Sequence, residues 1–268
     1  MLVKIKNLIN KLIYPLNIKI SKAKNDQSIY PVEATKRDIE IIDYILYPQD
    51  PRDSISKGAL SMVSVDRLWA VIQATKYIVK NDIEGDFVEC GVWRGGCSMA
   101  IAMVLDDLKA DKRIYLFDTF EGMTEPTKYD FDYSNLSAKD EFNKSKRDDH
   151  NEWCYASIEY VKTQFKKLDL DKKATFIKGD VIKTLNEETN LPEKIAFLRL
   201  DTDWYESTKH EMNILYPRLQ KDGVLLIDDY GHWQGSRKAI DEYLSEHDLT
   251  NRCLMWKTDY TGRGLIKK

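Results

Sequence analysis

The fold is decided by residues 85–96, which read Gly85-Asp86-Phe87-Val88-Glu89-Cys90-Gly91-Val92-Trp93-Arg94-Gly95-Gly96. Residues 86–90 have the length and the apolar content of a buried strand. The glycines that follow favour a tight turn, and residues 98–108 then read as a helix. Strand, glycine-rich turn and helix in this order predict the first unit of an alternating α/β fold.

The same strand pattern recurs four more times along the chain. The four later runs end at Asp118, Asp180, Asp201 and Asp228-Asp229, and segments with helical spacing occur at about 157–168, 206–219 and 236–245. This alternation predicts a doubly wound, mostly parallel, Rossmann-like sheet with helices on both faces. Because parallel strands end at one edge, we expect these acidic residues to share the edge where such sheets bind ligands.

Additions are expected around this core. Residues 1–60 are predicted to form a helical and loop extension, with helices at about 1–20 and 36–48, and the main domain is predicted to span 61–268, starting with a helix at about 64–80. Residues 122–156 form a polar insertion that is too long for an ordinary strand-to-helix connection and is typical of substrate-contacting loops. Residues 253–258 and 264–267 flank a turn and predict an antiparallel hairpin.

Composition excludes several classes of protein. The 268 residues include 41 Lys and Arg against 44 Asp and Glu, and the formal net charge of −3 argues against nucleic acid as a partner. The four cysteines form no CxxC pair, which favours a reducing, cytoplasmic compartment over a disulfide framework or a zinc site. No apolar run approaches the roughly 20 residues that span a bilayer.

The first 20 residues have an amphipathic pattern. Apolar residues recur at helical spacing, while Lys4, Lys6 and Lys11 interrupt them. Such a helix packs on its own domain or on a second subunit, which would make the protein a homo-oligomer. Its basic character also suits peripheral contact with an anionic membrane surface at the inner face of the membrane.

The glycine-rich turn has a distinctive chemistry. Its glycines, Gly91, Gly95 and Gly96, match neither the GxGxxG pattern nor a phosphate loop. A carboxylate from Glu89 beside the turn suits a cationic or ammonium-bearing cofactor better than a pyrophosphate. Asp118 ends the second strand, where doubly wound folds place an acid against ribose hydroxyls.

Four segments in this order resemble motifs of the macrocin O-methyltransferase (TylF-like) family, which are class I enzymes that use S-adenosylmethionine with a divalent cation. These segments are Glu89–Gly96, Phe117–Gly122, Leu200–Thr208 and Leu226–Gly231. The resemblance covers roughly residues 60–245. It implies that the methionine end of the cofactor contacts Glu89 and Gly91, and that Asp118 holds the ribose. It further implies adenine contacts from Asp180 and Val181 and a covering segment that includes Met62, Ser64 and Arg67.

The acidic strand ends predict a cation site. Three carboxylates at one edge repel each other unless a cation compensates them, and oxygen ligands select a hard ion such as Mg²⁺. Asp201, Asp228 and Asp229 are the predicted ligands. Asp203 is the predicted base that takes the proton of the acceptor hydroxyl, with His232 as the alternative because of its near-neutral pKa.

Together these features predict a metal-dependent O-methyltransferase that acts on a sugar hydroxyl of a glycan, glycoside or nucleotide sugar. A phenol or catechol acceptor is an alternative for the same site. A non-catalytic cofactor-binding or assembly protein of this fold is a second alternative. A dinucleotide-dependent oxidoreductase is disfavoured by the glycine spacing and by Glu89.

Overall fold

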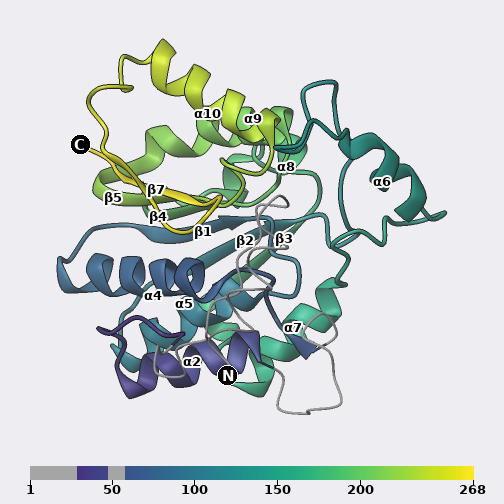
Figure 1. Cartoon of the computed structure of the whole chain (residues 1–268). Coiled ribbons are helices and arrows are strands. Elements are labelled where there is room, and N and C mark those ends of the chain that lie inside the picture. Colours follow the sequence, from purple (N-terminus) through teal and green to yellow (C-terminus); the bar gives the residue numbers. More distant parts are fainter. Residues whose placement is uncertain (1–28, 48–57) are drawn as a thin grey trace, which may run out of the picture. The chain divides into compact units, whose positions relative to one another are not determined.

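The structure is a computed structural model and describes residues 29–47 and 58–268. One compact unit runs from Glu33 to Lys268 and is built on a seven-stranded sheet of order β3-β2-β1-β4-β5-β7-β6 (Figure 1). The strands are β1 (Asp86–Cys90), β2 (Ile114–Asp118), β3 (Ala174–Lys178), β4 (Ile195–Leu200), β5 (Leu219–Ile227), β6 (Met255–Lys257) and β7 (Arg263–Ile266).

Strand pairing confirms the predicted fold class. β1 pairs in parallel with β2 and β4, β3 pairs in parallel with β2, and β5 pairs in parallel with β4. β7 pairs antiparallel with β5 and with β6, and the β6–β7 pair is the predicted C-terminal hairpin. β2 and β3 extend the sheet on one side of β1, while β4 and β5 extend it on the other. The strand order therefore reverses between β1 and β4, and open sheets bind ligands above such a point.

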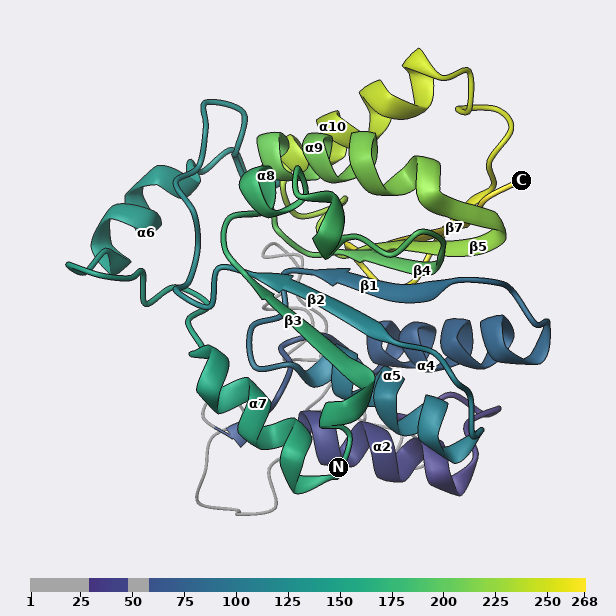
Figure 2. The ribbon, with the colours of Figure 1, turned by 180° about the vertical axis from the view of Figure 1, so that it is seen from behind.

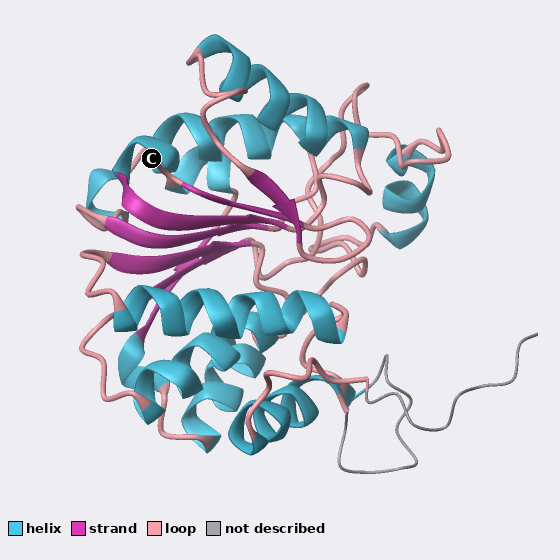
Figure 3. Cartoon of the chain, turned by 60° about the vertical axis from the view of Figure 1, so that its left-hand side comes forward, coloured by secondary structure: helices cyan, strands magenta, loops and turns pink. Residues whose placement is uncertain are grey.

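Helices cover both faces of the sheet (Figures 2 and 3). One layer contains α2 (Lys36–Leu46), α4 (Val65–Lys80), α5 (Gly96–Asp107) and α7 (Ile158–Lys167). The opposite layer contains α8 (Val181–Thr184), α9 (Tyr205–Leu215) and α10 (Gln234–Glu246). α6 (Ala138–Ser145) stands apart from both layers, and short 3₁₀ helices occur at Asp171–Lys173, Glu188–Asn190 and Tyr216–Arg218.

Burial on both faces explains the composition of the central strands. All six residues of β4 are buried, and so are the last four residues of β1. Phe87 on β1 stacks on Phe197 of β4 with ring centroids 5.2 Å apart. Parallel strands covered on both sides read as continuous apolar runs, so the one charged residue in β4, Arg199, has to find partners inside the protein.

The described structure contains two short helices beyond those that the sequence predicts. α2, in the predicted N-terminal extension, buries Ile41, Ile42 and Ile45 beside α4 and α5, so the compact unit begins at Glu33. α6 forms within the 122–156 insertion, and α8 follows Asp180; neither helix was predicted. The predicted helix at 1–20 lies outside the described residues. Among the described helices, none combines the length and hydrophobicity that a membrane-spanning segment needs.

Candidate active site

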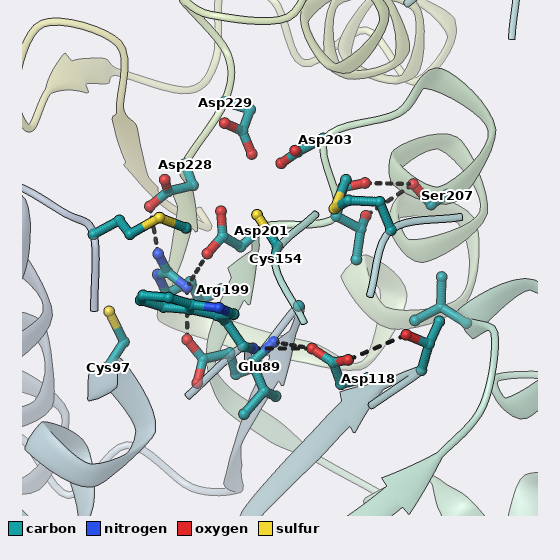
Figure 4. Close-up of a pocket in the computed structure, with 18 of the residues that line it drawn as sticks. Glu89, Cys97, Asp118, Cys154, Arg199, Asp201, Asp203, Ser207, Asp228 and Asp229 are labelled. Atoms are coloured by element: carbon teal, nitrogen blue, oxygen red, sulfur yellow. Dashed lines mark hydrogen bonds and ion pairs between the residues drawn. The ribbon is translucent and has the colours of Figure 1, made fainter. Parts of the chain in front are cut away.

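A cavity of about 440 Å³ lies at the carboxyl ends of β1, β2, β4 and β5 (Figure 4), and its volume falls in the range of small-molecule sites. The predicted site residues on its wall are Met62, Glu89, Gly91, Asp118, Asp180, Val181, Asp201, Asp203, Asp228, Asp229 and His232. Ser64 does not line this cavity. Its hydroxyl accepts from the amide of Arg67 at the start of α4 and donates to Asp259 at 2.7 Å, so it caps α4, and its predicted cofactor contact stays a prediction.

The glycine-rich turn brings the end of β1 against the end of β4. Gly91 has a φ of 81° and Gly95 a φ of 87°, both in the left-handed region that favours glycine. A Cβ atom on Gly91 would overlap the carbonyl oxygen of Asp201. The close approach of the turn after β1 to Asp201, at the end of β4, therefore depends on a glycine at position 91.

Asp118 holds the glycine-rich turn in place. Its Oδ2 accepts hydrogen bonds from the amides of Val92 (2.6 Å) and Trp93 (3.0 Å), and its Oδ1 accepts from the amide of Phe120 (2.6 Å). Burial raises the pKa of Asp118, and these amide bonds oppose that rise. Because Asp118 also lines the cavity, its predicted contact with a ribose stays open alongside this structural role.

A buried arginine joins Glu89, beside the glycine-rich turn, to the acidic strand ends (Figure 4). Arg199 is 2% exposed and donates to Glu89 at 2.6 Å, to Asp201 at 2.8 Å and to Asp228 at 2.5 Å. Burial raises the pKa of Glu89, while the charge on Arg199 lowers it. Sequence reasoning missed Arg199, although a lone arginine inside an apolar strand is a signal of buried, paired acids.

A second arginine holds Asp228 from the other side. Arg67 on α4 donates to Asp228, to Thr261 and to Asp259, the last through Nη2 and Oδ1 at 2.9 Å. Burial favours a higher pKa for Asp259, but hydrogen bonds from Arg67, Gly262 and Ser64 together with the charge on Arg67 outweigh it and lower the pKa to about 2. The segment predicted to cover the cofactor is thus tied to the end of β5 and to the β6–β7 turn.

Three carboxylates meet at the centre of the cavity. One oxygen each from Asp201, Asp203 and Asp229 lies within 4.8 Å of the others. Burial and mutual repulsion raise the pKa of Asp201 and Asp229 well above the ordinary value and raise that of Asp203 to about 7. Asp229 Oδ2 is buried without a hydrogen-bond partner among the described residues. An under-compensated set of oxygens of this kind fits a hard divalent cation.

The structure groups the predicted ligands differently from the sequence analysis. Asp201 and Asp229 lie together with Asp203, the predicted base, whereas Asp228 bonds to Arg199 through Oδ1 and to Arg67 through Oδ2. A carboxylate oxygen that accepts one hydrogen bond keeps a second lone pair, so Asp228 retains the capacity to bind a cation. The division of roles between Asp203 and Asp228 therefore stays a prediction.

His232 lies in the outer part of the cavity. Its ring centroid is 4.8 Å from that of Trp233 and 5.5 Å from that of Tyr133, and its backbone amide closes a turn with the carbonyl of Asp229. Burial lowers the pKa of His232, and the charge on Arg67 lowers it further. The imidazole is therefore neutral at pH 7 and has a free pair of electrons for a proton or a hydroxyl group.

Tryptophan side chains from the insertion and from the core form one wall of the cavity. The ring centroid of Trp204 is 5.5 Å from that of Trp153 and 4.9 Å from that of Trp233. Trp204 is 2% exposed, and its indole nitrogen donates to the carbonyl of Thr124 at 2.9 Å. Trp204 thus packs and anchors the wall, while Trp153 and Trp233 line the cavity.

Asp130 fixes the insertion to the core. This fully buried residue accepts a hydrogen bond from the amide of Tyr205 at the start of α9 (2.8 Å) and another from the amide of Thr127 (2.6 Å). A Cβ atom on Gly235, near the start of α10, would overlap the Asp130 carboxylate. The insertion is therefore fixed against α9 and α10 and forms one side of the cavity.

The family model described as macrocin O-methyltransferase (TylF) matches residues 24–263. The chain belongs to the TylF family. Similar curated proteins include the demethyldecarbamoylnovobiocin O-methyltransferase of Streptomyces niveus, 30% identical over 200 residues that cover 74% of this chain and 72% of that protein. The mycinamicin III 3″-O-methyltransferase of Micromonospora griseorubida is 27% identical over 195 residues, covering 72% of this chain and 73% of that protein.

Solved structures agree with this membership. The O-methyltransferase NovP has a TM-score of 0.72 and 25% identity, with 86% of this chain and 97% of that chain covered. The calicheamicin methyltransferase CalS11, at 16% identity and a TM-score of 0.56, shares the fold over 92% of this chain and 99% of its own. The TylF-family chain is therefore an S-adenosylmethionine-dependent O-methyltransferase with the class I fold.

Proposed function

We propose that this TylF-family enzyme methylates a hydroxyl group of a sugar, with a divalent cation such as Mg²⁺ bound beside the acceptor. The observation that carries the proposal is the carboxylate group Asp201, Asp203 and Asp229, which lines the same cavity as Glu89 and the glycine-rich turn. A methyl donor bound at the turn and a hydroxyl held at the carboxylates would face each other, which removes most of the entropic barrier to transfer.

The cofactor half of the cavity would be filled as the family resemblance implies. Glu89 and Gly91 would contact the methionine end, where a carboxylate complements the ammonium group, and Asp118 would reach the ribose. Asp180 and Val181 line the cavity where β3 leads into α8, which suits the adenine. Met62 is 64% exposed although it lines the cavity, so it is available to cover the bound cofactor.

The acidic residues would hold the cation through Asp201, Asp229 and Asp228. When bound, the cation supplies Lewis-acid stabilisation of the acceptor oxygen and so lowers the pKa of that hydroxyl. Arg199 and Arg67 orient Asp228 and limit the net negative charge of the site.

Asp203 would take the proton of the acceptor hydroxyl. Its φ of 70° is in the left-handed region, a strained conformation that proteins tolerate at functional sites. Burial raises the pKa of Asp203 to about 7, and a hydrogen bond from the side chain of Trp233 opposes the rise. Asp203 lies across the cluster from Glu89 (Figure 4), so a base with this pKa would face the acceptor side of the site.

Relatives support a sugar as the acceptor. A protein of Streptomyces olivaceus, 30% identical over 195 residues that cover 72% of this chain and 70% of that protein, is a 4′-O-methyltransferase of a rhamnosyl tetracenomycin C. The outer cavity of the present enzyme offers what a sugar needs, namely carboxylate oxygens for hydroxyl groups and tryptophan rings for the apolar face of a pyranose.

Methyl transfer from labelled S-adenosylmethionine to a panel of glycosides tests the proposal. We expect methylated glycoside that EDTA abolishes and Mg²⁺ restores, and at least a 100-fold loss of turnover in Asp201→Asn with S-adenosylhomocysteine binding kept. Asp248→Asn, at an exposed position just after the end of α10, is the matched control. Turnover that resists EDTA would refute the cation, and methylation of catechol alone would refute the sugar.

A further inference from the structure

Two exposed tyrosines stand at the outer rim of the cavity. Tyr133 is 60% exposed and Tyr260 is 72% exposed, and they come from separate parts of the chain, the 122–156 insertion and the β6–β7 turn. Their ring centroids are 6.4 Å apart at an interplanar angle of 89°. Tyr133 also lies 5.5 Å from the ring of His232, which lines the cavity itself. We call Tyr133, His232 and Tyr260 the aromatic platform.

Each tyrosine is presented by a turn that an aspartate holds. Asp132 Oδ1 accepts from the amides of Ser134 (2.8 Å) and Leu136 (2.9 Å), and Gln234 on α10 donates to the carbonyl of Asp132 at 2.8 Å. The turn that carries Tyr260 is held by Asp259. Two ordered turns that each expose an aromatic ring present contact surface at a low cost in conformational entropy.

The aromatic platform continues directly from the reaction site. His232 follows Asp229 by three residues in a tight turn, and it borders both the main cavity and an adjoining hollow lined by Tyr133, Tyr230 and Arg237. A ligand ring on the platform would therefore lie next to a sugar held at the carboxylates. Flat tyrosine faces match the C–H face of a pyranose or the face of an aromatic ring, and burying such faces against each other is favourable.

From this arrangement we propose that the aromatic platform is a binding subsite for a second ring of the acceptor, the ring next to the methylated sugar, so that Tyr133 and Tyr260 contribute to acceptor specificity. The second ring is a neighbouring sugar or an aglycone, and both offer the platform a flat, apolar face. This inference rests on the proposed sugar acceptor.

The test compares probes with one ring and with two. Methyl α-L-rhamnoside, 4-nitrophenyl α-L-rhamnoside and the methyl glycoside of a rhamnose disaccharide are titrated by ligand-observed NMR into the enzyme with S-adenosylhomocysteine and Mg²⁺. The same three forms of glucose and galactose are included. We expect at least one two-ring probe to bind roughly 3- to 10-fold more tightly than its one-ring counterpart. A preference for the nitrophenyl form identifies an aglycone, and a preference for the disaccharide identifies a sugar.

Substitutions of the two tyrosines test whether the platform causes the tighter binding of two-ring probes. Tyr133→Ala and Tyr260→Ala should each remove most of this difference in affinity, while the one-ring probe and S-adenosylhomocysteine bind as before. Tyr133→Phe should keep the difference. Tyr160→Ala on α7, which removes a ring that is 37% exposed, is the matched control and should keep it too. Equal binding of one-ring and two-ring probes, or a preference that survives both alanine variants, overturns the subsite alone. If no sugar probe binds while S-adenosylhomocysteine does, the proposed acceptor class is overturned together with it.

Discussion

The guanidinium of Arg199 donates to the carboxylate of Glu89 at 2.6 Å, and both side chains are at most 2% exposed. This contact is the centre of a chain of charges from the cofactor side of the cavity to the acidic strand ends. Removing one member of a buried ion pair leaves an uncompensated charge, which costs more than the pair itself contributes.

Arg199→Leu should therefore lower the free energy of unfolding by about 3–5 kcal/mol and weaken S-adenosylhomocysteine binding at least tenfold. Arg199→Lys keeps the charge but loses the fork of donors, so its effect should be intermediate. Urea denaturation and calorimetric titration measure both. Arg252→Leu removes an exposed arginine paired with Asp248 and is the control, with an expected change below about 1 kcal/mol. Equal effects at positions 199 and 252 would contradict the structural role.

The charges around the cavity predict that the cation and the sulfonium group of the cofactor compete for the same negative potential. Among the described residues on the cavity wall, the carboxylates of Glu89, Asp201, Asp203, Asp228 and Asp229 lie with the guanidinium groups of Arg67 and Arg199. A divalent cation bound at the carboxylates reduces the negative potential that attracts the sulfonium of S-adenosylmethionine, whereas S-adenosylhomocysteine lacks the sulfonium charge.

Mg²⁺ should consequently weaken S-adenosylmethionine binding relative to S-adenosylhomocysteine binding, by a factor of roughly 5 or more. Calorimetric titrations of each ligand with and without Mg²⁺ give the coupling. If Mg²⁺ changes both affinities equally, the sulfonium charge does not contribute to the coupling.

Asp203→Asn should reduce turnover by roughly 10²- to 10⁴-fold while S-adenosylhomocysteine and Mg²⁺ bind as before. The reason is that the asparagine side chain cannot take the proton of the acceptor hydroxyl. His232→Gln should have a smaller effect on turnover. Single-turnover methylation and Mg²⁺ titration separate the two roles. A large loss of Mg²⁺ affinity in Asp203→Asn, with little loss in Asp228→Asn, would instead assign Asp203 to the cation, as the grouping of oxygens allows.

Glu211 predicts a pH-dependent contribution to stability. It is fully buried on α9 and accepts a hydrogen bond from Thr202, between Asp201 and Asp203, at 2.8 Å; burial raises its pKa to about 8. Between pH 4.5 and 8 the unfolded chain releases this proton and the folded chain keeps it. Stability should therefore fall as the pH rises through this range, by up to about 1.4 kcal/mol for each unit, and level off above pH 8.

Glu211→Gln carries no titrating group, so its stability relative to the wild-type protein should increase from pH 5 to pH 8. Urea denaturation of both proteins across this range measures the difference. Parallel pH curves would show that Glu211 does not retain its proton in the folded state.

Local patterns explain why much of the fold was predictable. β1, the glycine-rich turn and the C-terminal hairpin each depend on neighbouring residues, and the sequence predicts them within one or two residues. The partners of Arg199 were not predictable in this way, since Glu89 lies 110 positions away in the chain. The sequence also does not show that Asp228 is bonded to Arg67, which lies 161 positions away in the chain.

The fit of Asp130 between the starts of α9 and α10 has a consequence for engineering. The 122–156 insertion is seated on the core through one carboxylate that requires a glycine at position 235. Exchanging this insertion with that of another family member should therefore transfer acceptor preference only when Asp130 and Gly235 are both kept. An exchange that loses this contact would yield a stable cofactor-binding core in which the insertion is misaligned with the rest of the site.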